Sequence, residues 1–352
     1  MMGERAGWGI LGTGKIARIF ARDLVDSRLG RLAAVGSRDA GRAEAFAAEF
    51  GALAHHSGYD ELIADPNVEF VYVATPHPTH LGLVLQAVAA GKHVLCEKPM
   101  AVTAQQARQM VEAAAAARVF LMEAFAFRCH PQTRALLDLL AQDEIGEIRA
   151  VTAAFGYDAG PAPTNYLLRP ELAGGSILDV GCYAVALMRQ LAGEAVGRRF
   201  RDPVRVEGAG LLHPESGVDL DASAVAWFED GFAAQLSCSI RTNLDSTARI
   251  TGTRGFIRLP APWLPGKFGG APRLLVQRRG TDAREVPIDA ARPLYAIEAD
   301  TVVEHARAGM NEAPEMSWSD TIGNMLTLDR WREAVGVRYE VAGESRSASV
   351  PA

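Results

Sequence analysis

A lysine, an aspartate and a tyrosine in this chain have the chemistry to move a proton at a carbon–oxygen centre. Lys98 directly follows an apolar run and precedes Pro99, while Asp179 and Tyr183 are four residues apart. That spacing puts two side chains on one face of a helix. A phenol titrates near ~10, and a nearby ammonium lowers its pKa toward the range where acid–base catalysis is efficient. Lys98 is the candidate for that ammonium, but the spacing alone equally fits a surface lysine and a tyrosine that packs on a sheet.

A glycine pattern near the N-terminus indicates a nucleotide. Residues 8–17 read Trp-Gly-Ile-Leu-Gly-Thr-Gly-Lys-Ile-Ala, an apolar run followed by Gly-x-Gly-x-x-Ala and a helical pattern. Gly12 permits a sharp turn, Gly14 leaves room for a diphosphate, and Ala17 lets the helix pack close to the strand. The helix N-terminus offers free N–H groups and a positive dipole end to the phosphates. This predicts the first turn of a dinucleotide-binding unit.

The end of the second predicted strand bears on which nucleotide binds. An NAD site usually has an acidic residue there, about 20 residues after the glycine turn, to accept from the ribose 2′-hydroxyl. Here the strand ends Val-Gly-Ser37-Arg38, so a hydroxyl and a guanidinium stand in its place. Because these groups suit a 2′-phosphate, we favour NADP over NAD. NAD stays open if Arg38 is only a surface residue and Asp39 takes the acid's part.

A polar loop, residues 74–80, follows a further apolar run and reads Ala-Thr-Pro-His-Pro-Thr-His. Loops at the carboxyl ends of parallel strands line the cofactor crevice, so we expect Thr75 and Pro76 against the nicotinamide ribose. His77 and His80 could instead bind a metal ion. However, no carboxylate or thiolate stands nearby in the sequence at ligand spacing, so we predict no metal site. The predicted cofactor-binding residues are Gly12, Thr13, Gly14, Lys15, Ile16, Ser37, Arg38, Thr75, Pro76, His77, His80, Glu97 and Lys98.

The elements that must position these residues alternate along the first 125 residues between apolar runs and helical patterns. This alternation predicts a doubly wound α/β domain in which helices join buried parallel strands. The predicted strands are Trp8–Leu11, Leu32–Val35, Phe70–Ala74, His93–Cys96 and Val119–Met122. The predicted helices include Ala40–Phe50, His80–Ala90 and Thr103–Ala117, the last capped by Thr103.

After about residue 145 the pattern changes to longer alternating runs, and Asp230-Gly231 between two of them is a strong hairpin signal. We therefore predict a second α/β domain with a large, mainly antiparallel open sheet. Its predicted strands are Gly146–Phe155, Ala222–Phe228, Phe232–Ile240, Ala248–Thr251, Phe256–Leu259 and Leu274–Gln277; its helices are Gly175–Leu191, Tyr295–Ala308 and Ser319–Ala334, with a loop at Pro260–Pro272. The predicted domains are 1–126 and 127–341, with a tail at 342–352, and the late helix at 319–334 is expected to pack back on the first domain.

Composition excludes several classes of protein. The 352 residues are 49% hydrophobic and 22% charged, with a net charge of −6 and no basic run, so we expect no nucleic-acid partner. Four widely spaced cysteines indicate buried thiols in a reducing compartment. The segment before Trp8 is too short and polar for a secretory signal, and charges break the most apolar tract, 111–127. We expect a cytoplasmic enzyme without membrane contact.

Five motifs occur in order over residues 9–183: Gly12-x-Gly14-x-x-Ala17, Ala74-Thr75-Pro76-x-x-x-His80, Glu97-Lys98-Pro99, Met122-Glu123-Ala124-Phe125 with Arg128 and His130-Pro131, and Gly174-Gly175 followed by Asp179-x-Gly181-x-Tyr183. Together they resemble the family of glucose–fructose oxidoreductase, inositol dehydrogenase and the rhizopine-catabolism protein, called Gfo/Idh/MocA. The helix at 319–331 is also similar to a late helix of that family. The combination of the Glu-Lys-Pro and Asp-x-Gly-x-Tyr motifs is highly specific.

The resemblance implies reversible hydride transfer between NAD(P) and a hydroxyl-bearing carbon of a sugar, cyclitol or trans-dihydrodiol. The family's catalytic lysine and tyrosine correspond to Lys98 and Tyr183, and Asp179 is expected to orient the substrate or the tyrosine. Inositol-type members carry histidine in place of this tyrosine, so the chain is more similar to the branch of dihydrodiol dehydrogenases and aldose oxidoreductases. The family also implies a homodimer or higher homo-oligomer formed through the open sheet. We expect the bare face to carry Ala222, Ala224, Ala226 and Phe228.

The substrate pocket is predicted less sharply. Many relatives carry arginine near the position of Leu167, and Arg169 is the nearest equivalent in this chain. Two other functions are open: an NAD(P)-binding redox sensor without turnover, against which the intact Lys98 and Tyr183 speak, and a redox-neutral NAD-dependent glycosidase. The candidate substrate residues are Arg128, His130, Phe155, Tyr157, Tyr166 and Arg169.

Overall fold

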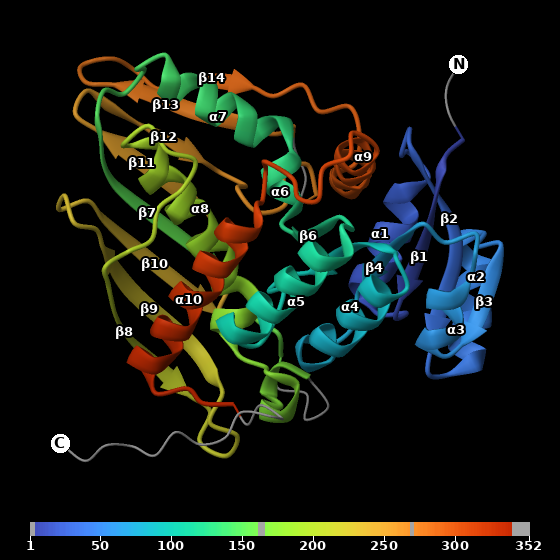
Figure 1. Ribbon diagram of the computed structural model, residues 1–352. Coiled ribbons are helices and arrows are strands. Elements are labelled where there is room, and N and C mark those ends of the chain that lie inside the picture. The colour runs from blue at the N-terminus through green and yellow to red at the C-terminus, as the bar shows by residue number, and fades with distance from the viewer. Residues whose placement is uncertain (1–3, 161–165, 268–270, 340–352) are drawn as a thin grey trace.

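Two β-sheets form the framework of the chain in the computed structural model (Figure 1). The structure describes residues 4–160, 166–267 and 271–339, so the predicted tail at 342–352 lies outside the described residues. A parallel sheet comes first along the chain and a mostly antiparallel sheet follows it. The predicted fold class is confirmed.

The first sheet has six parallel strands in the order β3-β2-β1-β4-β5-β6. β1 and β4 are buried along their whole length, as expected for central strands of a parallel sheet. The strand order reverses between them, and ligands bind beside the carboxyl ends of strands at such a point. The strands are β1 (Ala6–Leu11), β2 (Gly30–Ser37), β3 (Ala54–Ser57), β4 (Phe70–Val73), β5 (His93–Glu97) and β6 (Leu121–Ala124). The helices are α1 (Lys15–Leu24), α2 (Ala40–Phe50), α3 (Tyr59–Ala64), α4 (His80–Ala89) and α5 (Ala104–Ala117).

Two elements of this domain were not predicted. β3 is an edge strand of sequence Ala-His-His-Ser, and its alternate residues are exposed. α3 has only six residues. Neither element provides the apolar run or the long periodic stretch on which a prediction from sequence depends. β6 also begins at Leu121 rather than at Val119.

The second sheet has eight strands in the order β14-β13-β12-β11-β7-β10-β9-β8. β7 and β10 run parallel, and the other neighbouring pairs are antiparallel. The predicted hairpin joins β9 to β10, and Gly231 in its turn has φ = +82°, a conformation that favours glycine. The strands are β7 (Ile148–Gly156), β8 (Arg205–Leu212), β9 (Asp219–Trp227), β10 (Ala233–Ser239), β11 (Ala248–Gly252), β12 (Gly255–Leu259), β13 (Arg273–Arg278) and β14 (Arg284–Pro287).

Helices α8 (Cys182–Glu194) and α10 (Trp318–Val335) lie against one face of the second sheet, on the side of the first domain (Figure 1). The small apolar residues of β9 point to that side and are buried, so the prediction that they form the bare face is wrong. Side chains alternate along a strand, and the other face carries their neighbours instead. The buried residues are Ala222, Ala224, Ala226 and, beyond the strand, Phe228; the bare face presents Ser223, Val225, Gln235 and Ser237.

Two helices of the second half pack on the first domain. α10 lies against α5, where Asp329 accepts a hydrogen bond from the backbone N–H of Ala104 at 2.9 Å. α9 (Leu294–Arg307) lies against α1. Two short helices, α6 (Ala126–Cys129) and α7 (Pro131–Ala141), connect the halves. The contact of α10 with α5 is the packing expected for the late helix.

Among the described residues, one helical stretch, 170–194, is long and apolar enough to cross a membrane by length and composition. However, 89% of its apolar window is buried inside the protein. It contains α8, which packs against β7 and β10. The stretch is therefore the central helix of the second domain's core.

Candidate functional site

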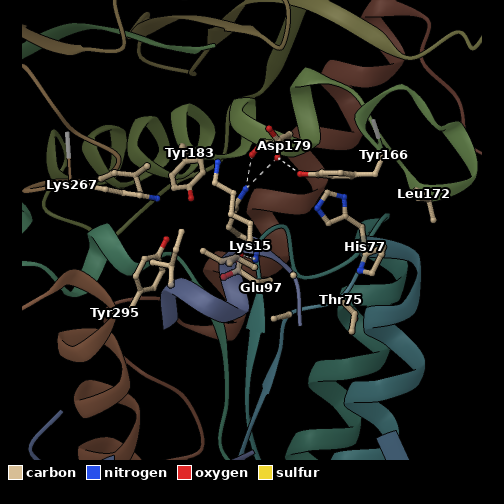
Figure 2. Close-up of a pocket in the computed structure, with 17 residues that line it drawn as sticks. Lys15, Thr75, His77, Glu97, Tyr166, Leu172, Asp179, Tyr183, Lys267 and Tyr295 are labelled. Carbon is tan, nitrogen blue, oxygen red and sulfur yellow. Dashed lines mark hydrogen bonds and ion pairs between the residues drawn. The ribbon is translucent and has the colours of Figure 1, made fainter. Parts of the chain in front are cut away.

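A pocket between the two halves of the chain collects residues that are far apart in the sequence (Figure 2). Its first wall is formed by the start of α1 and the carboxyl ends of β4 and β5. Its second wall comes from α8, α9 and two loops of the second half. The three predicted catalytic residues all lie here. The lining residues are Gly14, Lys15, Ile16, Ile19, Ala74, Thr75, Pro76, His77, Glu97, Lys98, Tyr166, Leu172, Asp179, Tyr183, Leu264, Lys267 and Tyr295.

The glycine turn between β1 and α1 has the shape that its motif requires. Gly12 has φ = +103°, and a Cβ there would lie 2.7 Å from the carbonyl oxygen of Ala74. Gly14 precedes α1, and apart from its two chain neighbours no described residue has a heavy atom within 4 Å of the place a Cβ would take. This open space before a helix N-terminus, with Lys15 beside it, fits the diphosphate of a dinucleotide. Thr13 lies in the turn without lining the pocket.

The loop after β4 holds two histidines with different roles. His77 lines the pocket, and burial lowers its pKa to about 3, so its ring is neutral. His80 is fully buried, with Nε2 2.8 Å from the carbonyl oxygen of Thr75 and Nδ1 3.2 Å from that of Met100. The prediction that His80 contacts the cofactor is wrong, because its ring ties the Thr75 loop to the segment after β5.

Lys98 follows β5 and is joined to Pro99 by a cis peptide bond. Its Nζ donates to the backbone oxygen of Asp179 at 2.6 Å and lies 3.9 Å from the Oδ1 atom of that residue. The same nitrogen lies 4.8 Å from the centre of the Tyr183 ring. Burial acts to lower the pKa of Lys98, but the acidic groups of Cys182 and Asp179 outweigh it and raise that pKa above its usual value. Lys98 is therefore an ammonium.

Tyr183 lies at the pocket with 8% of its surface exposed. Burial, followed by the negative charge of Glu97, raises its pKa well above the ordinary value of 10.0. The prediction that Lys98 lowers this pKa is wrong for the chain without ligands, since the ammonium lies over the ring face and burial disfavours the phenolate. The phenol is therefore protonated. Its ring contacts Phe125, Phe155 and Trp263, with centroids 5.5, 5.3 and 6.0 Å away.

Asp179 accepts hydrogen bonds from two tyrosines. The Tyr157 hydroxyl donates to Oδ2 at 2.6 Å. The Tyr166 hydroxyl lies 3.5 Å from Oδ1 (Figure 2). Burial, followed by the charge of Asp179, raises the pKa of both phenols, which keeps them as donors. Tyr166 lines the pocket and is 46% exposed, whereas Tyr157 supports Asp179 from outside the lining. Asp179 is therefore fixed in place with Lys98 beside it.

Glu97 ends β5 and lines the pocket next to Lys98. The hydroxyl of Tyr72 donates to its Oε1, and the backbone N–H of Lys98 lies 3.3 Å from its Oε2. Burial raises the pKa of Glu97, although Lys98 and Tyr72 act against this shift. Glu97 thus places a buried carboxyl group where the cofactor crevice meets Lys98.

A wide turn begins the helix that carries Asp179 and Tyr183. Residues Ile177–Gly181 form a π-helical turn directly before α8, a feature common at functional sites. Asp219 of β9 accepts from the Ser176 hydroxyl at 2.7 Å and from the backbone N–H of Ile177 at 2.6 Å. Both donors bond to the same carboxylate oxygen, so Asp219 fixes where this turn begins.

Five predicted substrate residues lie outside the pocket lining: Arg128, His130, Phe155, Tyr157 and Arg169. Phe155 packs against Tyr183, and Tyr157 bonds to Asp179. The predictions are wrong for Arg128 and His130, which are buried and engaged elsewhere. Arg128 is buried in an ion pair with Asp320, so it joins α6 to α10. Arg169 is half-exposed and pairs with Glu171 at 2.8 Å. His130 caps α7 by accepting from a backbone N–H. The described residues also bring together no group of three or more His, Cys, Asp or Glu side chains that could hold a metal ion.

Ser37 and Arg38 lie at the carboxyl end of β2, beyond the pocket lining. The Ser37 hydroxyl accepts from the backbone N–H of Asp39 at 3.2 Å. The Asp39 carboxylate caps α2 by accepting from the N–H of Arg42 at 3.0 Å. Asp39 is therefore engaged by its own helix, while the exposed Arg38 extends from the strand end.

Six lining residues were not among the predicted site residues: Ile19, Ala74, Leu172, Leu264, Lys267 and Tyr295. Leu264 and Lys267 come from a segment that was predicted only as a loop. Its proline and glycine content indicates a turn but not where the turn is directed. Tyr295 lies on the predicted helix α9, where no motif marks it.

Models of two protein families match the chain in sequence. The family described as an oxidoreductase family with an NAD-binding Rossmann fold matches residues 6–125. The family described as the GFO/IDH/MocA C-terminal domain matches residues 133–258. Together the two matches span more than half of the chain.

Known proteins are similar over nearly the full length. Trans-1,2-dihydrobenzene-1,2-diol dehydrogenase of Mus musculus is 36% identical over 339 residues, covering 94% of this chain and 97% of that enzyme. The structure of KijD10, a 3-ketoreductase from Actinomadura kijaniata in complex with NADP and TDP-benzene, is 26% identical with a TM-score of 0.84, covering 94% and 98% of the two chains. Levoglucosan dehydrogenase in complex with NADH and levoglucosan, 20% identical with a TM-score of 0.81 over 95% and 98%, shares the fold.

Proposed function

The chain belongs to the Gfo/Idh/MocA family of NAD(P)-binding oxidoreductases, and from this premise we propose that it interconverts a hydroxyl and a carbonyl group on a small cyclic diol, with NADP as its cofactor. One observation carries the proposal. Lys98 from the first domain and Asp179 and Tyr183 from the second converge in the pocket that begins at the glycine turn. Such a site has a cation, a proton-transferring phenol and a place for a dinucleotide within one enclosure.

The proposed mechanism assigns each group one task. The bound cofactor supplies or accepts the hydride. In reduction, the Tyr183 phenol donates a proton to the substrate oxygen while the ammonium of Lys98 stabilises the negative charge that develops there. In oxidation, Tyr183 accepts that proton from the hydroxyl. Asp179 positions Lys98, and the two tyrosine donors hold Asp179 still.

The walls of the pocket favour a ring-shaped substrate. Tyr166, Tyr183 and Tyr295 combine flat apolar faces with hydroxyl groups, and Leu264 adds apolar surface. A cyclic vicinal diol offers both an apolar ring and a second hydroxyl for such a lining. The similarity to trans-dihydrodiol dehydrogenase over 94% of the chain supports this substrate class. A sugar is the second candidate, as the resemblance to the Gfo/Idh/MocA family implies.

NADP is the proposed cofactor because of the strand end at β2. Ser37 and Arg38 place a hydroxyl and a guanidinium where an acidic residue would favour NAD, and the only nearby carboxylate on that turn, Asp39, caps α2. The complex of KijD10 with NADP gives further support.

The test is nicotinamide reduction by the purified, dialysed protein. NADP and NAD are compared with trans-1,2-dihydrobenzene-1,2-diol, aldoses and inositols as substrates. We expect turnover with NADP on the dihydrodiol, and a loss of about 100-fold or more in kcat for Tyr183→Phe, since one acid–base group contributes that much. Tyr59→Phe, outside the pocket, is the matched control and keeps full activity.

Other outcomes would favour other functions. Tight NADPH binding with no turnover on any substrate would indicate a redox sensor. Release of a sugar from a glycoside without net change in nicotinamide absorbance would indicate a redox-neutral glycosidase. Equal activity of the Tyr183→Phe variant and the wild type would remove Tyr183 from the mechanism.

A further inference from the structure

Lysine is rare in this chain, and its positions are informative. Of 36 Lys and Arg residues, four are lysines: Lys15, Lys92, Lys98 and Lys267. Lys92 donates to two backbone carbonyl oxygens between α3 and β4, so its role is structural. The other three line the pocket. A chain that uses arginine for nearly all its cations thus keeps lysine mainly in its candidate site.

The two residue types differ in what they offer to a ligand. A guanidinium is large, planar and always charged, whereas an ammonium is a compact charge on a flexible stem. A compact charge reaches a buried oxygen in a narrow space and binds a phosphate as a point charge. Lys98 is used in this way at the reacting oxygen, and Lys15 stands at the glycine turn. Lys267 has no task in the proposed reaction.

Lys267 comes from the second domain, in the loop after β12, and enters the pocket on the side of Tyr183 and Tyr295, opposite Tyr166 (Figure 2). Burial, followed by the positive charges of Lys15 and Arg22, lowers the pKa of Lys267. Lys15 and Arg22 lie on α1. Lys15 is the first residue of that helix and Arg22 lies in its last turn, so the strongest charges acting on Lys267 are cations along one flank of the cofactor-binding helix, with Lys15 acting most.

These cations, brought together from two domains, create a region of positive potential that attracts an anion. Asp23 and Glu97 reduce this potential in part; Asp23 is paired with Arg22 at 2.6 Å and Glu97 accepts from Tyr72. The open space in front of Gly14 lies at the end of α1 where Lys15 stands. A ligand with negative charge at this position would be attracted by Lys15, by the helix N-terminus and by Lys267.

We propose that Lys267 is a cofactor-binding residue supplied by the second domain, and that its ammonium contacts the diphosphate of the nicotinamide dinucleotide opposite Lys15. The proposal rests on the proposed function, because it requires NAD(P) in this pocket. The 2′-phosphate is not the target, since Ser37 and Arg38 lie beyond the pocket lining. A bound dinucleotide would then be held from both domains at once.

The test measures the Kd for NADPH and for NADH by the change in nicotinamide fluorescence, with wild type, Lys267→Gln and Lys267→Arg. We expect Lys267→Gln to raise both Kd values about tenfold, the loss of one hydrogen bond to a charged group. The factor should be equal for the two cofactors because both contain the diphosphate. Lys267→Arg should raise the two Kd values by a smaller factor. Rising salt should reduce the difference in Kd between Lys267→Gln and wild type. Arg108→Gln, an exposed position on α5 outside the pocket, removes the same charge and should leave both Kd values unchanged.

The outcomes separate this proposal from the proposed function. If wild type binds neither cofactor, the proposed function itself fails. If wild type binds NADPH and Lys267→Gln binds it equally well, Lys267 does not contact the cofactor and the inference is overturned. An unchanged Kd for NADPH with a raised KM for the diol would assign Lys267 to the substrate instead. A rise in Kd for NADPH alone would place the ammonium at the 2′-phosphate and would also overturn the inference.

Discussion

The protonation state of Tyr183 decides whether the site is ready for carbonyl reduction or for alcohol oxidation. Burial holds its pKa well above 10.0, and the carboxyl groups of Glu97 and Asp179 add to this shift. Lys98 does not reverse it, because the ammonium lies over the ring and is paired with Asp179. A phenol of this kind is always ready to donate, so carbonyl reduction needs no prior deprotonation at neutral pH.

The expected consequence is a flat pH profile for reduction. Since the pKa of Tyr183 is raised, the phenol loses its proton only at high pH, and kcat for reduction should stay constant from about pH 7 to pH 9. His77 is neutral over this range because its pKa is about 3, so it adds no step. The measurement is kcat for NADPH oxidation with a saturating ketone at several pH values. A tenfold fall per pH unit within this range would show that the bound ligands lower the pKa of Tyr183.

At the scale of elements, the turn before α8 connects the second sheet to the catalytic residues. Asp219 lies on β9, and through Ser176 and Ile177 it holds the start of the π turn from which Asp179 points into the pocket. A Cβ on Gly175 would lie 2.2 Å from the other oxygen of Asp219, so the chain passes close to this carboxyl. The position of the catalytic helix therefore depends on one buried acid.

We predict that Asp219→Ala lowers kcat more than it raises KM, because the turn loses its anchor, while Asp219→Asn keeps an acceptor and most of the activity. Burial raises the pKa of Asp219 to about 6. An acid whose pKa is raised in the folded state stabilises it at low pH and loses that contribution as pH rises from about 4 to 6. The Tm of wild type relative to Asp219→Asn should therefore fall across this window. An equal slope in both proteins would mean that Asp219 titrates normally.

The motif-bearing elements of the first domain could be predicted because each carries a local signal. The glycine turn, the Thr103 cap and the apolar strands all depend on neighbours in sequence, and the structure contains them. β8 was missed because its glycines and exposed residues leave no apolar alternation. Arg128 was assigned to the substrate because a cation near a motif looks functional, and sequence does not reveal that Asp320, far along the chain, neutralises it.

At the scale of the whole molecule, the second sheet leaves one face without a covering helix in the described chain (Figure 1). Its residues on β9 and β10 are small or polar, with Val225 among them, and the Ser223 and Ser237 hydroxyls lie 3.1 Å apart. An antiparallel sheet can face water on one side, but a broad flat face of this kind also suits pairing with a second copy.

We predict that the protein is a homo-oligomer joined through this face, as expected from the family. Val225→Glu places a charge on this face, on β9, and should shift the mass measured by light scattering toward that of the monomer. Val25→Glu is the matched control, since Val25 is 71% exposed on the first domain, and this variant should keep the wild-type mass. A monomeric wild type would contradict the prediction.

The two domains are also joined within one chain, at α9. Asp300 accepts from the Ser27 hydroxyl at 2.5 Å and from the backbone N–H groups of Arg28 and Leu29 at 3.1 and 3.0 Å. Despite burial, these hydrogen bonds lower the pKa of Asp300. Because α9 also carries Tyr295, this contact sets how one wall of the pocket stands relative to the cofactor domain.

We expect Asp300→Asn to loosen the contact between α9 and the start of β2. An acid whose pKa is lowered by folding stabilises the protein above its unfolded pKa of about 4 and loses that contribution as pH falls through the folded value. The Tm of the variant should therefore lie below that of wild type at neutral pH, with the gap closing on acidification. KM for the substrate should rise while the Kd for NADPH stays constant, because Tyr295 moves and the glycine turn does not. Asp282→Asn, at an exposed position, should change neither quantity. If Asp300→Asn raised the Kd for NADPH as much as KM, the contact would act on both domains as a unit rather than on the substrate wall alone.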